Sequence, residues 1–221
     1  MMKNNITWWE KFSPTIMEAE VPQKFINIIN NTGDEVLKDD GLSKKFDFSD
    51  NLVGKVHKEV TIPVPDDDKG YCLSILRQGC VRYLRQMIEL GRAYEWIKKS
   101  GGNQNPSEEN INLSQSWIVS QYKHEYNPIH THSGHFSGVI YLKLPDEMEN
   151  HFNEETKDHY PASGLIEFSH GEKQDFKSDT LMFKPRVGQM LLFPNWLKHT
   201  VYPFYCEGER RSMSFNAYWK V

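Results

Sequence analysis

Three histidines and one arginine in the second half of the chain have the types and spacing of a metal-binding site. His130 and His132 are separated by one residue, so on a strand their side chains would lie on the same face. His199 follows on a later segment and can supply a third ligand. Arg210 comes soon after it and can hold an acid whose other end binds the metal. The pattern therefore predicts a facial, three-point metal centre beside an acid-binding group.

The second ligand position is unusual. Non-haem Fe(II) sites of this kind combine two histidines with one carboxylate, whereas His132 would supply a neutral imidazole. Such a site is one negative charge short, which changes its electrostatics and its redox potential. Two interpretations stay open. Either His132 is a true third ligand, or a carboxylate from elsewhere, such as Asp146 or Glu167, completes the site.

Arg210 begins a strand in which polar and apolar residues alternate, so Arg210 and Ser212 share one face. Polar residues that face the interior of a barrel cost free energy unless they bind something. The fork of guanidinium donors together with one hydroxyl can clamp a carboxylate. The alternative is a surface strand whose solvent face carries Arg210. The position of Arg210 after His199 favours the carboxylate clamp.

The second half of the chain is predicted to be all-β. Its short apolar runs, separated by turn residues, are typical of a sandwich or jelly roll. The predicted strands are 116–122, 136–144, 164–168, 180–184, 189–193, 199–205 and 211–219. The acidic segment 146–158 is expected to form an exposed loop, with a substrate lid as the alternative.

The first half is predicted to be mainly helical. A short entry strand is expected within residues 6–19, followed by a helix that opens at Val21-Pro22, and a long helix is expected from about 71 to 99. Residues 30–70 are polar and rich in turn formers, which predicts loops with brief strand or helix. Gly79 and Gly91 mark points of close packing or a break in the long helix.

The expected fold class is α+β, a double-stranded β-helix (jelly roll) braced by N-terminal helices. Residues 1–221 are expected to form a single domain, with 1–105 as mainly helical support and 110–221 as the jelly-roll core.

Composition limits the partners and the location. The net charge of −4 argues against nucleic acid as the main partner. No apolar run approaches the roughly 20 residues needed to span a bilayer, so no membrane partner is expected. The polar start and the three cysteines without CxxC spacing predict a cytoplasmic protein with free thiols.

Six motifs together resemble a known family over residues 116–219. They are H-x-H at 130–132, SGVIYL at 137–142, SGLIEF at 163–168, P-x-x-G-x-M-L-L-F-P at 185–194, H-x-V-x-P at 199–203 and R-x-S-x-S-F-N at 210–216. The combination is similar to the 2-oxoglutarate/Fe(II)-dependent oxygenase superfamily. Within it, the pattern resembles the prolyl-hydroxylase-like oxygenases of marine bacteria and their phages.

The resemblance implies Fe(II), 2-oxoglutarate as cosubstrate, and O2. It also implies roles for the three histidines. His130 and His199 match the two metal-binding histidines of the family, and His132 stands at the place of the carboxylate ligand. The predicted metal ligands are therefore His130, His132 and His199.

Four further residues are implied to bind the cosubstrate. Arg210 and Ser212 match the pair that holds the C5 carboxylate of 2-oxoglutarate, and Tyr141 matches a tyrosine that often hydrogen-bonds the same group. Tyr122 or Gln121, from the strand before His130, faces the cosubstrate. Strand alternation allows one of these two but not both.

By this resemblance the protein hydroxylates a small molecule, a peptide or a protein, and a prolyl residue of a protein is the candidate substrate. Two other functions stay open. One is a cupin-like metalloenzyme that does not use 2-oxoglutarate, for which three histidines are ordinary. The other is a non-enzymatic jelly-roll binding module with structural histidines. Fold-level analogy fixes neither the prime substrate nor the oligomeric state.

Overall fold

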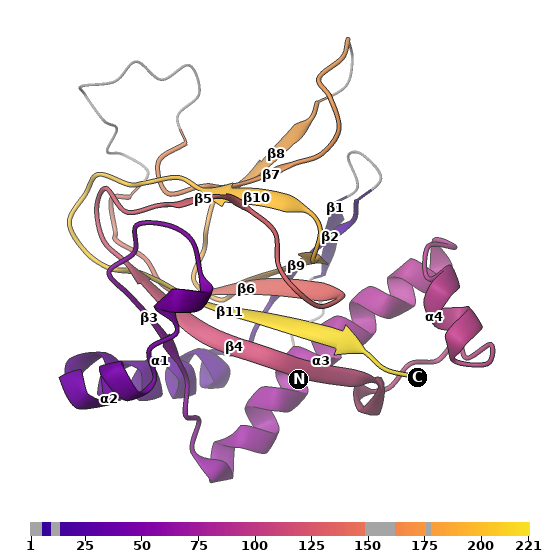
Figure 1. Ribbon diagram of the computed structural model, residues 1–221, viewed down its shortest axis with the longest axis horizontal. Helices are drawn as coiled ribbons and strands as arrows, with labels where there is room; N and C mark the ends of the chain where they lie inside the picture. Colours follow the sequence, from indigo (N-terminus) through magenta and orange to yellow (C-terminus); the bar gives the residue numbers. More distant parts are fainter. Residues whose placement is uncertain (1–5, 10–13, 149–161, 176–177) are drawn as a thin grey trace.

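The computed structural model describes residues 6–9, 14–148, 162–175 and 178–221. It has three layers: a four-stranded sheet, a seven-stranded sheet, and helices against the outer face of the larger sheet (Figure 1). The larger sheet has the order β1-β2-β9-β6-β11-β4-β3 and the smaller one the order β5-β10-β7-β8, with antiparallel pairing throughout. The α+β jelly-roll prediction is confirmed.

The strands of the two sheets come from both halves of the chain. Their bounds are β1 Thr7–Trp9, β2 Ile16–Glu20, β3 Lys58–Thr61, β4 Ile111–Gln121, β5 Asn127–His130, β6 Phe136–Lys143, β7 Ile166–Ser169, β8 Thr180–Phe183, β9 Gln189–Pro194, β10 Lys198–Val201 and β11 Arg210–Trp219. All seven strands predicted in the second half are present. The structure adds β5, whose four residues lacked a clear apolar alternation, and β3 in the first half.

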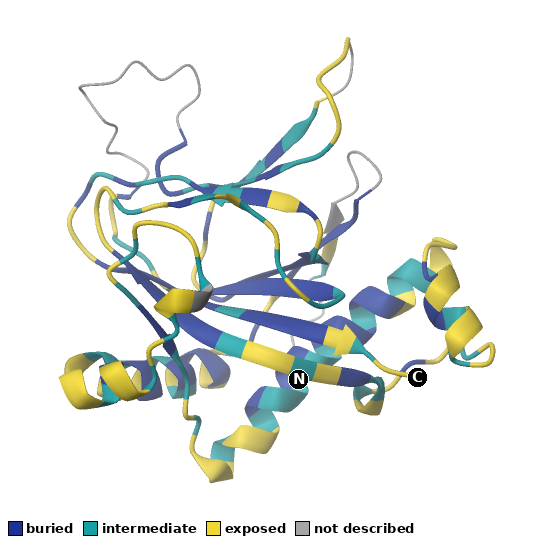
Figure 2. Ribbon diagram, in the orientation of Figure 1, coloured by how far each residue is buried: buried dark blue, intermediate teal, exposed yellow. Residues whose placement is uncertain are grey.

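The helices brace one face of the larger sheet. They are α1 Gln23–Lys38, α2 Asp40–Lys45, α3 Asp66–Glu89 and α4 Tyr94–Lys99, with short 3-10 turns at Ser49–Asn51 and Glu108–Asn110. Apolar side chains of α1 and α3 pack on those of β4, β6, β9 and β11 in one core. A second core fills the space between the two sheets. Figure 2 shows both buried layers, with the exposed residues on the outer sides of the helices.

The prediction of loops across residues 30–70 was wrong at both ends of that segment. Helix α1 continues to Lys38 because Thr32, Gly33 and Val36 extend its buried face. Gly33 allows this close packing, since a Cβ there would lie 2.4 Å from Cδ1 of Ile118. Helix α3 begins at Asp66, directly after Pro65, with three acidic residues in its first turn. Negative charge at a helix N-terminus is stabilising.

Both glycines that were singled out in the long helix have a structural role. Gly91 adopts a φ of +67° between α3 and α4, a conformation that glycine takes readily, so the helix breaks there. A Cβ on Gly79 would lie 2.9 Å from Cε of Met190, so Gly79 lets α3 approach β9 closely. Residues 7–9 and 16–20 form two strands where one entry strand was expected. No helix in the described ranges is long and apolar enough to cross a membrane.

Candidate metal and cosubstrate site

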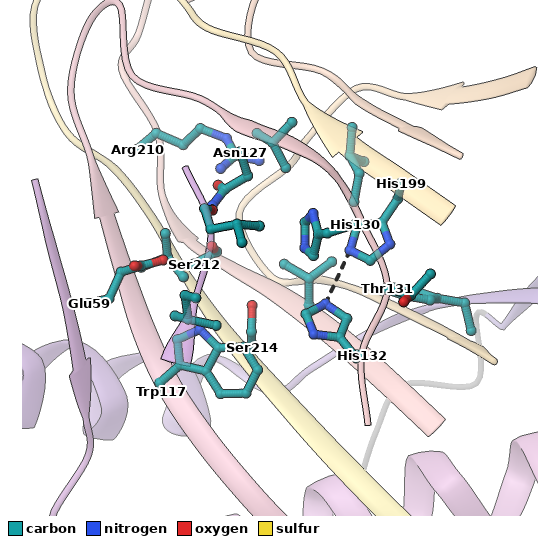
Figure 3. A pocket seen from close by; sticks show the side chains of 18 residues that line it. Glu59, Trp117, Asn127, His130, Thr131, His132, His199, Arg210, Ser212 and Ser214 are labelled. Atoms are coloured by element: carbon teal, nitrogen blue, oxygen red, sulfur yellow. Dashed lines mark hydrogen bonds between the residues drawn. The ribbon is translucent and has the colours of Figure 1, made fainter. Parts of the chain in front are cut away.

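Three histidines converge between the two sheets (Figure 3). His130 ends β5 and stands directly opposite His199 of β10 in the antiparallel pairing. His132 follows two residues beyond the end of β5. One ring nitrogen from each histidine lies within 4.8 Å of the others, and Nε2 of His132 is 3.2 Å from Nε2 of His199. In the part of the chain that the structure describes, these three form the one group of side chains arranged to hold a metal.

Backbone carbonyl groups orient two of the rings. Nδ1 of His130 lies 2.7 Å from the carbonyl oxygen of Pro128, and Nδ1 of His199 lies 3.0 Å from that of Leu197. A carbonyl oxygen only accepts, so Nδ1 carries the proton in each ring. The lone pair of Nε2 is then free to bind a metal.

Burial keeps the histidines neutral, as metal binding requires. It lowers the pKa of His130 and, together with the nearby His130, lowers the pKa of His132 to about 4. The pKa of His199 lies well below its usual range, mainly because of burial and then because of the two neighbouring histidines. All three therefore present neutral imidazoles at neutral pH.

Two hydrogen bonds to Asn195, in the loop between β9 and β10, hold the backbone of His132 in place. Its amide donates to the carbonyl oxygen of Asn195 at 3.0 Å, and Nδ2 of Asn195 donates to the carbonyl oxygen of His132 at 3.0 Å. The expectation that His130 and His132 share one strand was wrong, because β5 ends at His130. This clamp to Asn195 holds His132 at the cluster in place of strand geometry.

Neither carboxylate that was considered as a third ligand joins the cluster. Asp146 is exposed in the segment after β6. Glu167 of β7 accepts a hydrogen bond from the hydroxyl of Tyr202 at 3.3 Å. The loop or lid expected at 146–158 lies outside the described residues from 149 onward.

Arg210 is buried in the same cavity with free donors. Its side chain is 2% exposed, Nη1 donates to Oε1 of Gln121, and neither Nε nor Nη2 has a partner among the described residues. A buried donor without a partner costs about 1–3 kcal/mol, and more when it is charged. The guanidinium therefore has strong hydrogen-bonding capacity left for a ligand.

Two neighbours extend this donor group. Tyr141 of β6 lies beside Arg210, whose guanidinium carbon is 5.0 Å from the centre of the tyrosine ring. Its buried hydroxyl makes no hydrogen bond of normal geometry with any described residue. Ser212 pairs with Tyr141 across β11 and β6 and lines the cavity with Arg210. The structure thus brings Arg210, Ser212 and Tyr141 together.

Tyr122 does not belong to this group. Its side chain is 40% exposed and packs edge-on against the ring of His57, 5.0 Å away. Gln121, its neighbour in the chain, is buried, accepts from Arg210, and donates to Oδ1 of Asn127 at 3.0 Å. Strand alternation allowed one of the two residues to face inward. It is Gln121, so the assignment of Tyr122 is corrected here.

The histidines and Arg210 line one cavity of about 140 Å³ between the sheets (Figure 3). Trp117 of β4 also lines this cavity, whereas sequence reasoning missed Glu59 of β3 and Asn127 of β5 as lining residues. Asn127 lay close to a segment already expected to be a strand. Glu59 lies in the segment expected to be loops, so no signal pointed to it.

Residues 115–216 match the family model described as "Putative 2OG-Fe(II) oxygenase". This part of the chain is similar to 2OG-Fe(II) oxygenases. Oxygenases of this family use Fe(II), 2-oxoglutarate and O2, and the three-histidine cluster and the Arg210 group both lie within the matched residues. The expected enzyme class and cofactors are confirmed. No curated protein matches the sequence significantly.

One solved structure with a TM-score above 0.5 shares the fold of this chain, and two prolyl hydroxylases match it with lower scores. AviO1 from Streptomyces viridochromogenes Tue57 is 13% identical, with a TM-score of 0.55 over 93% of this chain and 89% of that one. A Trichoplax adhaerens prolyl hydroxylase, solved with a hypoxia inducible factor peptide fragment, is 13% identical, with a TM-score of 0.48 over 96% and 82% of the two chains. A Pseudomonas putida prolyl-4-hydroxylase is 16% identical, with a TM-score of 0.45 over 91% of each chain.

Proposed function

We propose that the protein is a hydroxylase in which His130, His132 and His199 hold Fe(II), while Arg210, Ser212 and Tyr141 hold the C5 carboxylate of 2-oxoglutarate. The observation that carries this proposal is the buried Arg210, whose unpartnered donors share a cavity with the three neutral histidines. A cavity with a metal-binding end and a carboxylate-binding end matches a ligand that has a keto acid at one end and a carboxylate at the other.

The histidine cluster fits a metal ion. With metal–nitrogen bonds of about 2.1 Å, the 3.2 Å between Nε2 of His132 and Nε2 of His199 corresponds to an angle of roughly 100° at the metal. This angle is close to that between neighbouring ligands of a facial triad. The protonated Nδ1 atoms of His130 and His199 leave the facing nitrogens free. Three imidazoles suit a divalent transition metal such as iron.

The Arg210 group fits a carboxylate. Two free guanidinium nitrogens, the hydroxyl of Tyr141 and the hydroxyl of Ser212 can all donate to carboxylate oxygens. Oε1 of Gln121 accepts a hydrogen bond from the third guanidinium nitrogen, Nη1, and so fixes the plane of the guanidinium group. Bound acid would satisfy donors that are otherwise buried without partners.

Bound Fe(II) supplies the oxidation, in which O2 and 2-oxoglutarate give succinate, CO2 and one oxygen atom inserted into a substrate C–H bond. The chain's own residues position and shield this chemistry. Arg210 fixes one end of the cosubstrate, and the carbonyl groups of Pro128 and Leu197 fix the imidazoles. Apolar lining side chains such as Val139 and Phe193 keep water away from the reacting atoms.

The substrate is proposed to be a small molecule, a peptide or a protein, and the sequence resemblance makes a prolyl residue the candidate. Peptides that contain proline should then gain the mass of one oxygen atom when they are incubated with the protein, Fe(II), 2-oxoglutarate and O2. Mass spectrometry of a proline-to-alanine peptide pair provides the control, because only the proline peptide should change.

The core of the proposal is tested without any prime substrate. With Fe(II), 2-oxoglutarate and O2, the protein should form succinate slowly, and calorimetry should show 2-oxoglutarate binding that depends on the metal. If 2-oxoglutarate binds equally with and without metal, or not at all, the proposed function fails.

The three-histidine ligand set favours one alternative, a cupin-like metalloenzyme that does not use 2-oxoglutarate. Arg210 would then bind an acid group of the substrate. Under this alternative, metal binding persists and His199→Ala abolishes it, but 2-oxoglutarate neither binds nor turns over. In a non-enzymatic binding module, His199→Ala would leave ligand binding unchanged.

A further inference from the structure

Glu59 places a buried carboxyl group in the cavity that Arg210 also lines. Strand β3 extends the larger sheet beyond β4, and Glu59 stands opposite Val119 in that pairing. The side chain is 6% exposed and lines the cavity, and its Oε1 has no hydrogen-bond partner in the described ranges. A buried acceptor without a partner is costly. Its position in the cavity marks it as a group that binds a ligand.

The surroundings of Glu59 favour a positively charged ligand. Trp117 lines the same cavity and lies between Glu59 and His132 in the view of Figure 3. An aromatic face next to a carboxylate is a common way to bind a cationic nitrogen. Two further carboxylates, Asp47 and Glu125, add negative potential here. Burial, and then these two groups, raise the pKa of Glu59 to about 7.

The cosubstrate does not account for Glu59. 2-Oxoglutarate carries two negative charges, and a carboxylate in its binding region would repel it. Arg210 does not neutralise Glu59, because its guanidinium donates to Gln121 and packs on Tyr141, and the charges that act on the Glu59 carboxyl are those of Asp47 and Glu125. The cavity therefore contains hydrogen-bond donors at Arg210 and an acceptor without a partner among the described residues at Glu59, and this acceptor remains for the prime substrate.

We propose that Glu59 determines substrate specificity by binding a cationic nitrogen of the prime substrate, an amine or guanidinium group, which packs against Trp117. This inference rests on the proposed function, since it takes the histidines as the place of reaction. It also narrows the substrate class. Free or N-terminal proline presents a cationic ring nitrogen at neutral pH, whereas an internal prolyl residue does not. An internal proline would need a neighbouring lysine or arginine to engage Glu59.

Matched pairs of ligands that differ in the charge of one nitrogen test this proposal. The pairs are L-proline with N-acetyl-L-proline, L-arginine with L-citrulline, and L-lysine with Nε-acetyl-L-lysine. Each is titrated by calorimetry into the protein loaded with Mn(II) and 2-oxoglutarate. At least one cationic member should bind roughly tenfold or more tightly than its neutral partner, as a charge-assisted hydrogen bond would give.

Glu59→Gln keeps the shape of the side chain and should reduce this preference at least about tenfold. Glu59→Asp, which keeps the charge but shortens the side chain, should retain part of it. Glu167→Gln is the matched control, because Glu167 is a half-buried carboxyl outside the cavity lining, and it should keep the full preference. Circular dichroism verifies that each variant is folded.

The proposal is overturned if no cationic ligand is preferred, or if Glu59→Gln keeps the preference. A failure of the proposed function looks different. In that case 2-oxoglutarate binding does not depend on Mn(II), while the preference for cationic ligands in metal-free protein still depends on Glu59.

Discussion

Arg210 and Arg211 are adjacent in β11, yet their guanidinium groups lie on opposite faces of the sheet. Arg211 is paired on the helix side, where Nε and Nη2 donate to Glu209 at 2.8 and 2.9 Å and Nη2 lies 2.8 Å from Asp34 of α1. Arg210 faces the cavity, where two of its nitrogens have no partner among the described residues. Arg211 is therefore paired with acidic residues of the protein itself, whereas Arg210 has donors available for an acidic ligand.

Arg210→Ala should therefore weaken 2-oxoglutarate binding while sparing the metal. The loss should be on the order of 100-fold, because it removes charge-assisted hydrogen bonds in a buried site. Calorimetry with 2-oxoglutarate and, separately, with Mn(II) measures the two effects. Equal loss of metal binding would mean that Arg210 is structural.

Arg211→Ala should lower the stability of the fold but leave 2-oxoglutarate binding unchanged. It leaves Glu209 buried without its main partner, which should cost about 3–5 kcal/mol of stability. Urea unfolding at low temperature measures this cost. The folded fraction should bind 2-oxoglutarate with the affinity of the wild type, and a weakened affinity would contradict the separation of the two faces.

His199→Ala should lower the affinity for Fe(II) or Mn(II) by more than roughly 100-fold. Residues that only orient a metal ligand contribute about 10–100-fold, so the ligand itself should contribute more. His135→Ala is the control, since His135 stacks on Trp219 with ring centroids 4.3 Å apart, outside the cluster. If both variants lose metal equally, the loss reflects folding and not ligation.

Position 132 should accept a carboxylate. His132→Ala should weaken metal binding at least about tenfold, whereas His132→Asp should stay within roughly tenfold of the wild type, because it restores the set of two histidines and one carboxylate. The backbone clamp to Asn195 does not involve the side chain at 132 and should persist in both variants. Metal titration with both variants checks this. Unchanged binding by His132→Ala would remove His132 from the ligand set.

Glu59 should make stability depend on pH. Its pKa rises from 4.5 to about 7 on folding, so the folded state holds the proton more tightly than the unfolded state. The stability that this gives is present below pH 4.5 and is lost as the pH rises through 7. Glu59→Gln has no carboxyl at this position, so it does not lose stability in this way. The unfolding free energy of Glu59→Gln relative to that of the wild type should therefore be larger at pH 8 than at pH 4.5, by on the order of 3 kcal/mol.

Urea unfolding of wild type and Glu59→Gln at pH values from 4.5 to 8 provides the measurement. The other titrating groups are common to both proteins, so the difference between their curves isolates Glu59. A difference that stays constant with pH would show that the carboxyl of Glu59 is not perturbed in the folded protein.

The sequence predicted the second half of the fold well because each strand there carries its own alternation of apolar residues and its own turn residues. It also identified His130, His132, His199 and Arg210, whose side chains the structure brings to one cavity. These residues lie in or beside those strands. Local patterns were therefore sufficient to place them.

The rest depended on contacts between distant segments. The four residues of β3 become a strand because they pair with β4, and only this pairing brings Glu59 into the cavity. Helix α1 continues through an asparagine- and glycine-containing stretch because its buried face packs on the sheet. The choice between Gln121 and Tyr122 required knowledge of which face of β4 points inward.

The two edges of the larger sheet limit where the chain can be cut. β2 covers the edge of β9, and β3 covers the edge of β4. Residues 115–216 alone would lose both partners and expose the backbone edges of β4 and of the largely apolar β9, which invites edge-to-edge aggregation. We therefore expect residues 1–221 to fold as one domain, and a fragment that begins near residue 110 to precipitate even though it carries every proposed metal ligand.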